Sequence, residues 1–213
     1  MNITVFGATG VIGSLTVDRL LEAGHTVTAY ARNPSKVPER WADRVRLVVG
    51  ELSDSESVDH AVHGADVVVS ALGPLTDRTI TGLPLTDGVQ HILAAMSRHG
   101  VTRYVGHGTP SVLDPQESPT PMTRFVSFTA RTFIRRAYDD MTAMSAAIMS
   151  SGLDWTIVRF IRPTNGDSTG TVRSGFFGTD KLGFAITRAD IAAFTVAQVD
   201  DTRYIGRAPA VSN

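Results

Sequence analysis

Two spacings of apolar residues alternate along the chain, and this alternation predicts strands and helices in turn. Short runs rich in β-branched and aromatic residues indicate strands, whereas apolar residues at helical spacing that end near glycine indicate helices. The predicted strands are residues 2–6, 25–31, 44–49, 66–72, 102–107 and 155–159. The predicted helices are about residues 12–23, 53–63, 86–98 and 188–199, and a pair within residues 122–151 with a break near Tyr138.

This order of elements predicts an α/β fold, a Rossmann-type doubly wound parallel sheet. With 213 residues, the chain 1–213 is expected to form a single domain. Residues 160–185 are rich in glycine, threonine and proline and interrupt the alternation. We expect them to form a small C-terminal appendage, a lid or wall on the substrate side, with a short hairpin around residues 171–173. Residues 207–211 are expected to add an edge strand, and residues 108–121 a long functional or mobile loop.

Two of the predicted helices begin with a capping signal. Ser53 precedes Glu56 by three residues, and Thr187 precedes Asp190 by the same spacing. A hydroxyl at such a position accepts a hydrogen bond from a free backbone N–H group of the first turn. We therefore expect Ser53 and Thr187 to cap the helices that follow them.

The first predicted strand runs directly into a glycine-rich turn and then into a helix. The turn reads Gly7-Ala8-Thr9-Gly10-Val11-Ile12-Gly13. Gly7 can make the tight turn, Gly10 leaves room for a phosphate, and Gly13 lets the helix pack closely on the strand. The positive end of the helix then favours a pyrophosphate. Nucleotide binding is predicted, the alternative being an ordinary turn from strand to helix.

In a doubly wound sheet, ligands bind at the carboxyl ends of the strands, near the switch in strand order. Five segments of this chain are expected to meet there. They are residues 7–13, Arg32, and residues 71–74, 108–111 and 160–163. The sequence therefore predicts one crevice that holds both the nucleotide and its reaction partner.

The end of the second predicted strand favours NADP(H) over NAD(H). An NAD site usually carries a carboxylate there for the ribose hydroxyls, but the sequence reads Tyr30-Ala31-Arg32-Asn33. A guanidinium at Arg32 can bind a 2′-phosphate in bidentate fashion, with Lys36 one short turn further on. The alternative is a solvated arginine on a polar turn.

Composition limits the partners and the chemistry. Lysine plus arginine number 20 against 21 acidic residues, and a net charge of −1 predicts no general attraction to nucleic acid or to an anionic membrane. Cysteine is absent, which excludes disulfides and thiolate chemistry. A strand that begins next to Met1 leaves no room for a signal segment, and no apolar run is long enough to span a bilayer, so a cytoplasmic protein is expected.

Two groups of cationic and metal-binding side chains have simple interpretations. His60 and His63 lie three residues apart on a predicted helix, but no carboxylate completes a site, and no metal is expected. Arg131, Arg135 and Arg136 share part of a helix face, which we interpret as solvated.

Several motifs together resemble the atypical short-chain dehydrogenase/reductase group. They are the glycine turn, Arg32-Asn33-Pro34, Gly50-Glu51-Leu52, the stretch 151–159 and the stretch 187–192. Within this group the chain is similar to the NAD(P)H-binding branch that includes biliverdin reductase B, a flavin reductase, and NmrA-like proteins. The expected cofactor-binding residues are Gly7, Thr9, Gly10, Val11, Ile12, Gly13, Arg32, Asn33, Lys36, Glu51, Leu52, Ala71, Leu72, Gly73, Thr109 and Phe160.

The chain departs from the group's pattern in its acid/base residues. Many members use a tyrosine with a lysine four residues later, but the residues four after the tyrosines here are Pro34, Gly108, Thr142 and Ala208. Alcohol oxidation and sugar-nucleotide epimerisation by the usual route are therefore disfavoured. Glu51 also stands where the group often has aspartate, and Phe160 where it often has proline.

Without that pair, the cofactor is expected to supply most of the reactivity. Hydride transfer to a flat, electron-poor acceptor needs mainly stacking distance, orientation and exclusion of water. The resemblance implies a hydroxyl near the nicotinamide at Thr109, with Ser111 as a close second. His107 is a candidate proton relay and Arg162 a candidate for orienting an acidic acceptor, against packed and solvated alternatives respectively. Asp140 lies where other members of the group place a polar residue beside the substrate, but together with Asp139 we interpret it as part of a solvated helix face.

The predicted function is an NADPH-dependent reductase of a small conjugated acceptor such as a flavin, a quinone or a tetrapyrrole. The alternative is an NmrA-like redox sensor that binds NADP without turnover, and a nucleotide-sugar epimerase or dehydratase is less favoured. A small molecule is the expected partner, and the chain is expected to be a monomer or a homodimer.

Overall fold

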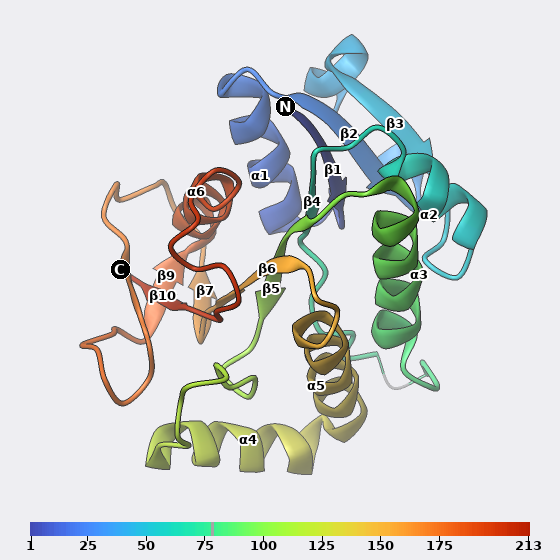
Figure 1. Cartoon of the computed structure of the whole chain (residues 1–213). Coiled ribbons are helices and arrows are strands. Elements are labelled where there is room, and N and C mark those ends of the chain that lie inside the picture. Colours follow the sequence, from blue (N-terminus) through green and yellow to red (C-terminus); the bar gives the residue numbers. More distant parts are fainter. Residues whose placement is uncertain (78) are drawn as a thin grey trace.

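The central feature of the structure, a computed structural model that describes residues 1–77 and 79–213, is a sheet of eight strands covered by helices on both faces (Figure 1). The first half of the chain comprises β1 (Asn2–Phe6), α1 (Val11–Glu22), β2 (Thr26–Ala31), η1 (Pro34–Lys36), η2 (Glu39–Arg44), β3 (Val45–Val49), α2 (Ser55–Val62), β4 (Val67–Ser70) and α3 (Pro84–His99). The second half comprises β5 (Arg103–Gly108), α4 (Pro121–Phe133), α5 (Arg135–Met149), β6 (Asp154–Arg159), β7 (Arg162–Thr164), β8 (Arg173–Gly175), β9 (Ala185–Thr187), α6 (Arg188–Ala197) and β10 (Ala210–Ser212).

The strand order in the sheet is β3-β2-β1-β4-β5-β6-β10-β8. Every neighbouring pair is parallel except β10 and β8, and Ile3 of β1 pairs with both Val27 of β2 and Val67 of β4. The chain thus builds outward from β1 to β3 and returns beside β1 with β4. The predicted Rossmann-type fold is confirmed, and its switch in strand order lies between β1 and β4.

The core consists of two apolar layers, one on each face of the sheet. Successive residues of β1 show the division, because Val5 packs in the layer that includes α1 and α6, whereas Phe6 packs in the layer that includes α2, α3 and α5. The four residues of β4 are all buried, as expected for a strand covered on both faces. This double burial fixes the register and brings the carboxyl ends of β1, β2 and β4 to one edge.

Two details of the helices differ from the expectation. The break between α4 and α5 falls at Ile134, whose φ of −136° and ψ of 45° are not helical, and not at Tyr138. The side chain that caps α2 belongs to Asp54, which accepts hydrogen bonds from the backbone N–H groups of Glu56 and Ser57, so the assignment to Ser53 is wrong. Thr187 does cap α6, as predicted.

The C-terminal strands also pair differently from the prediction. The hairpin expected around residues 171–173 is absent from the described residues; β8 there pairs with β10, and β7 pairs with β9 in a small parallel sheet. The edge strand expected at 207–211 is instead an inner strand, since β10 lies between β6 and β8. Its three residues are buried, as expected for a strand with a neighbour on each side. Within the described ranges, no helix combines the length and apolar character needed to cross a bilayer.

Candidate active site

A cleft of about 690 Å³ lies at the carboxyl ends of β1, β2, β3 and β4. It gathers most of the predicted cofactor-binding residues, namely Gly7, Thr9, Gly10, Arg32, Asn33, Lys36, Glu51, Leu52, Ala71, Leu72 and Gly73. Other residues of the lining were not predicted: Tyr30, Ala31, Ser53, Leu75, Pro84, Leu85, Asp87 and Gly88. The sequence therefore located the cleft but not the wall that α3 adds to it.

The glycine turn forms the floor of this cleft by close backbone contacts. Gly7 has a φ of +73°, and its carbonyl oxygen accepts a hydrogen bond of 3.0 Å from the N–H of Gly10. A Cβ atom on Gly13 would lie 2.1 Å from the same carbonyl oxygen, and one on Gly7 would lie 3.0 Å from the backbone of Ala71. The helix α1 can therefore approach the turn only because residue 13 is glycine.

Within residues 1–77 and 79–213, the backbone donors at the N-terminus of α1 have no side-chain partner. Gly10 is the N-cap and provides no side-chain hydrogen bond, and the first turn contains no acidic residue. Since the first N–H groups of a helix have no partner within it, they carry a partial positive charge that an anion can neutralise. A cleft of this shape and polarity fits the pyrophosphate of a dinucleotide. Val11, Ile12 and Gly13 begin this helix beside the lining.

The end of β2 presents a basic wall to the cleft. Arg32 and Lys36 are exposed and belong to the lining. Asn33 lies between them, and its side-chain oxygen accepts hydrogen bonds of 2.9 Å and 2.7 Å from the backbone N–H and the hydroxyl of Ser35. Asn33 therefore shapes the η1 turn that carries Lys36. The acidic residues of the described lining, Glu51 and Asp87, come from other elements.

Tyr30 holds the segment after β3 in place. Its hydroxyl donates to the carbonyl oxygen of Glu51 at 2.8 Å and lies 2.7 Å from the hydroxyl of Ser57. Burial raises the pKa of the Tyr30 phenol, so the phenol stays protonated and can donate. A Cβ atom on Gly50 would lie 2.6 Å from the Tyr30 oxygen. This contact between Tyr30 and Gly50 arises because β2 and β3 are neighbours in the sheet, and the sequence alone did not predict it.

Asp140 of α5 caps α3, the helix that lines the cleft. Its carboxylate accepts hydrogen bonds from the N–H groups of Leu85 at 3.1 Å and Thr86 at 2.9 Å, and from the Thr86 hydroxyl at 2.8 Å. Asp140 is completely buried, so its interpretation as part of a solvated face is wrong. One turn earlier, Arg136 donates to the carbonyl oxygen of Leu75 in the loop before α3. Both contacts join segments far apart in the sequence and could not be read from it.

His107 lies in the apolar layer beneath α6. Its Nε2 atom is 3.0 Å from the hydroxyl oxygen of Thr195, which itself donates to the carbonyl oxygen of Ile191, so Nε2 carries the proton. The ring meets Phe160 edge to face at 5.5 Å. Burial lowers the pKa of His107 to about 4, and the ring is neutral near pH 7. This environment fits the packed alternative better than a proton relay.

The remaining candidates lie outside the described lining of the cleft. Thr109 and Ser111 are half-buried at the start of the loop after β5, where the Thr109 carbonyl accepts a turn hydrogen bond from Val112. Phe160 is half-buried after β6, and Arg162 is exposed as the first residue of β7. They follow neighbouring parallel strands, so they lie toward the same edge of the sheet as the cleft. Their roles remain predictions.

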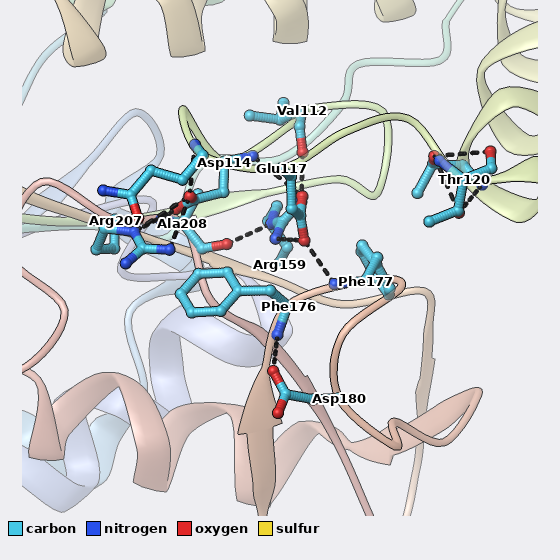
Figure 2. A network of polar contacts seen from close by, with 12 residues as sticks. Val112, Asp114, Glu117, Thr120, Arg159, Phe176, Phe177, Asp180, Arg207 and Ala208 are labelled. Atoms are coloured by element: carbon cyan, nitrogen blue, oxygen red, sulfur yellow. Dashed lines mark hydrogen bonds and ion pairs between the residues drawn. The ribbon is translucent and has the colours of Figure 1, made fainter.

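The loop after β5 is held by a buried ion pair (Figure 2). Arg159, fully buried at the end of β6, contacts both carboxylate oxygens of Glu117, with N–O distances of 2.6 Å and 2.8 Å. Arg159 also donates to the carbonyl oxygens of Val112 and Ala208. The same Glu117 accepts a hydrogen bond of 2.5 Å from the N–H of Phe177 in the appendage. The loop expected to be functional or mobile is thus tied to β6 and to the appendage at once.

A second buried carboxylate strengthens this attachment. Asp114 accepts hydrogen bonds from Arg207 at 3.0 Å and from the N–H of Ala208 at 2.7 Å (Figure 2). Burial raises the pKa of Asp114, but the hydrogen bonds from Arg207 and Ala208 outweigh it and hold the pKa below its usual value. Asp114 is therefore an ionised structural group. Among the described residues, no group of three or more histidine and acidic side chains is placed to hold a metal ion.

Comparison with known proteins agrees with this geometry. A family model described as NAD(P)H-binding matches residues 7–202. A (4-alkanoyl-5-oxo-2,5-dihydrofuran-3-yl)methyl phosphate reductase from Streptomyces griseus is 30% identical over 99% of this chain and 67% of its own length. A 3-diazoavenalumate denitrifying reductase from Streptomyces sp is 38% identical over 56% of this chain, and the match spans 41% of that protein.

Solved structures show the same architecture. ChuY, an anaerobillin reductase from Escherichia coli O157:H7, has a TM-score of 0.81 with 19% identity, and the match covers 100% of this chain and 97% of that one. At this identity the likeness establishes the fold. Together with the family model, the atypical short-chain dehydrogenase/reductase resemblance of the motifs is confirmed. The chain belongs to the NAD(P)H-binding family.

Proposed function

We propose that this protein is an NADPH-dependent reductase that transfers hydride to a small conjugated acceptor such as a flavin, a quinone or a tetrapyrrole. Family membership and the names of the two relatives, both reductases, support the reductase class. The match spans 67% of the length of the first relative and 41% of the length of the second. The observation that carries the choice of cofactor is the basic wall at the end of β2, where Arg32 and Lys36 line the cleft.

The residues present fit a dinucleotide phosphate. The glycine turn and the free N–H groups of α1 would hold the pyrophosphate. Arg32 and Lys36 would hold a 2′-phosphate, because a guanidinium and an ammonium both stabilise that charge, whereas β2 ends without the carboxylate that a ribose 2′-hydroxyl prefers. Glu51 and Leu52, kept in place through Tyr30, would border the adenine side.

The protein's own contribution to the reaction is mainly orientation and exclusion of water. Reduced nicotinamide supplies hydride when it is bound, and a conjugated acceptor needs little further activation. The chain has no tyrosine followed by lysine at the fourth position to act as acid. We propose that the Thr109 hydroxyl bonds the nicotinamide or the acceptor, that residues 160–185 wall the acceptor side, and that the proton comes from solvent.

Cofactor choice can be tested by thermal shift and by titration with NADPH and NADH. At about one hundred times its dissociation constant, a bound cofactor stabilises the folded state by about 2.7 kcal/mol. Arg32→Gln is expected to weaken NADPH binding by about ten- to one-hundredfold, as for loss of a charge-assisted hydrogen bond, and to leave NADH binding nearly unchanged. Arg44→Gln, an exposed arginine before β3, is the matched control. Equal affinities of the wild-type protein for the two cofactors would contradict the proposal.

Turnover can be followed as loss of NADPH absorbance with a panel of flavins, quinones and linear tetrapyrroles. We expect at least one acceptor to be reduced, and Thr109→Val to lower kcat while the affinity for NADPH is kept. A variant that turned over as fast as the wild-type protein would remove Thr109 from the reaction.

One observation favours a second function, an NADP-binding redox sensor. Three polar groups near the proposed acceptor side are engaged in structure: His107 contacts Thr195, and Asp114 and Glu117 are paired with arginines. A protein whose polar groups are engaged in this way could bind NADPH and report its redox state without turnover. Strong NADPH binding with no reduction across the whole panel would favour this function.

A further inference from the structure

The helix α4 carries an unusual concentration of exposed aromatic side chains. Phe125, Phe128 and Phe133 are 67%, 68% and 75% exposed, and Ile134 next to them is 41% exposed. These are three of the nine phenylalanines of the chain. Figure 1 shows α4 along the lower edge of the molecule, next to α5 and on the side of the sheet where β5 ends. Large apolar side chains rarely gather on a surface that faces only water.

Helical geometry separates two faces of α4. Thr123 is buried, and Val126 and Ala130 on the same side are half-buried against the rest of the protein. Phe125 and Phe128, three residues apart, lie on the opposite side. They cannot reach the core without unwinding the helix, which is capped at Thr120 by reciprocal hydrogen bonds with Thr123.

The exposed side of α4 is also basic. Arg124 and Arg131 flank the two phenylalanines, and within the described part of the chain neither forms an ion pair. Residues 118–138 contain no aspartate or glutamate. The acidic side chains that precede this segment, Asp114 and Glu117, are buried and paired with Arg207 and Arg159. Their charges therefore do not offset the positive charge of the helix.

We propose that this aromatic and basic face, defined by Arg124, Phe125, Phe128 and Arg131, docks on a membrane surface that contains anionic lipids. A helix with phenylalanines flanked by arginines suits the boundary between acyl chains and headgroups, where the rings enter the apolar region and the guanidinium groups reach the phosphates. Each arginine near an anionic surface adds to the affinity.

This inference departs from the expectation drawn from net charge. A value of −1 for the whole chain predicts no general attraction to a membrane. However, salt screens surface charges beyond about 8 to 10 Å. The arginines of α4, rather than the net charge of the whole chain, therefore determine how this face binds. The docking face is independent of the reductase reaction. Docking would nevertheless bring the side of the sheet on which β5 ends toward the membrane, where apolar conjugated molecules accumulate.

Two other occupants fit the face less well. A second copy of the chain, packed face to face, would bring Arg124 and Arg131 against the same arginines, with no acidic residue of α4 to pair them. An acidic protein would also neutralise the arginines, but the two phenylalanines project from a single convex helix. A planar surface satisfies both features at once.

The test is sedimentation of the full chain with vesicles of phosphatidylcholine alone or mixed with phosphatidylglycerol. We expect binding to the mixed vesicles only, and its loss when salt is raised from about 0.1 M to about 1 M, which shortens the Debye length from about 10 to about 3 Å. Arg124→Gln with Arg131→Gln should weaken binding by about thirtyfold. Phe125→Ser with Phe128→Ser should weaken it by at least about tenfold.

Controls keep folding and function separate from docking. Arg44→Gln and Leu47→Ser remove an exposed arginine and an exposed apolar side chain near β3, far from α4, and should bind vesicles as the wild-type protein does. NADPH affinity of every variant is measured in parallel, so a failure of cofactor binding is distinguished from a failure of docking. The proposal is overturned if the protein does not bind vesicles or binds neutral vesicles equally well. It is also overturned if the wild-type protein is a dimer and the phenylalanine variant is a monomer.

Discussion

The cofactor cleft and the region after β5 are held together by different kinds of interaction. Around the cleft, the backbone itself makes the contacts, since Gly7 turns with a positive φ and Gly13 admits α1 against the Gly7 carbonyl. After β5, buried charged side chains make them, as the Arg159–Glu117 pair shows. The backbone contacts around the cleft leave N–H donors available to a ligand. The ion pairs after β5 instead engage the polar side chains of that region in contacts with one another.

Asp190 is a further carboxylate of the C-terminal region that is engaged in structural hydrogen bonds. It accepts hydrogen bonds from Ser168, Thr169 and Thr187 and thereby joins the appendage to α6. Burial raises the pKa of Asp190, but these hydrogen bonds outweigh it and hold the pKa well below its usual value. A carboxylate so engaged is a poor proton donor. The difference between the two regions supports the proposal that the cleft binds the cofactor and that the protein contributes few side chains to the reaction.

The largest effect is expected from breaking the buried ion pair. Arg159→Met leaves Glu117, whose side chain is 3% exposed, without its partner. An uncompensated buried charge should lower the free energy of unfolding by about 3–5 kcal/mol, measured by urea denaturation. The double variant Arg159→Met/Glu117→Leu should recover part of the loss. NADPH affinity under folding conditions should change little, because the cleft is built from other contacts.

An exposed ion pair provides the control for this variant. Arg203 and Asp201 are 65% and 29% exposed, and Arg203→Gln should cost no more than about 1 kcal/mol. If both arginine variants lowered stability equally, or if Arg159→Met weakened NADPH binding as much as stability, the two regions would not be held independently.

A smaller effect is expected from a methyl group in the glycine turn. In Gly13→Ala, the added Cβ would lie 2.1 Å from the Gly7 carbonyl oxygen, so helix and turn must separate. We expect a loss of about 1–3 kcal/mol in stability, as for overpacking, together with weaker NADPH binding. Gly73→Ala is the matched control, since Gly73 also lines the cleft but a Cβ there meets no atom within 4 Å. Normal NADPH affinity in Gly13→Ala would contradict the role given to the turn.

The same contrast explains what the sequence could predict. The glycine turn, the strands from β1 to β6 and the basic residues after β2 are local patterns, so the fold and most of the cleft lining followed from them. Contacts between distant segments were missed. Asp140 looked solvated because its partners, Leu85 and Thr86, lie on another helix 54 or 55 residues away.

The predictions for the C-terminal strands were wrong for a related reason. A run of three residues such as β8 has no periodicity of its own, and its pairing with β10 depends on where the chain returns to the sheet. The apolar residues of β10 indicated a strand, but only the neighbours on both sides make it an inner one. Likewise, nothing near Glu117 in the sequence showed that Arg159 would be its partner.

The effect expected to be smallest at neutral pH concerns His107, which lies between the two regions on β5. Its pKa is about 4 in the folded protein and near 6.5 in an unfolded chain, because burial disfavours the charged ring. The unfolded state therefore binds more protons between these values. The free energy of unfolding should fall by about 1.4 kcal/mol for each pH unit as pH drops from about 6.5 to about 4, and this contribution should level off below pH 4, where both states are protonated.

His107→Gln keeps a side-chain N–H donor for Thr195 and removes the titrating ring, so it should flatten the dependence of stability on pH in that range. His60→Gln, at an exposed histidine of α2, is the matched control for the substitution itself. The pH profile of kcat separates the two interpretations of His107. If the ring only packs, the profile of kcat keeps its shape in His107→Gln. If a limb near the pKa of the buried ring, about 4, disappears, His107 relays a proton, and the region after β5 supplies chemistry as well as structure.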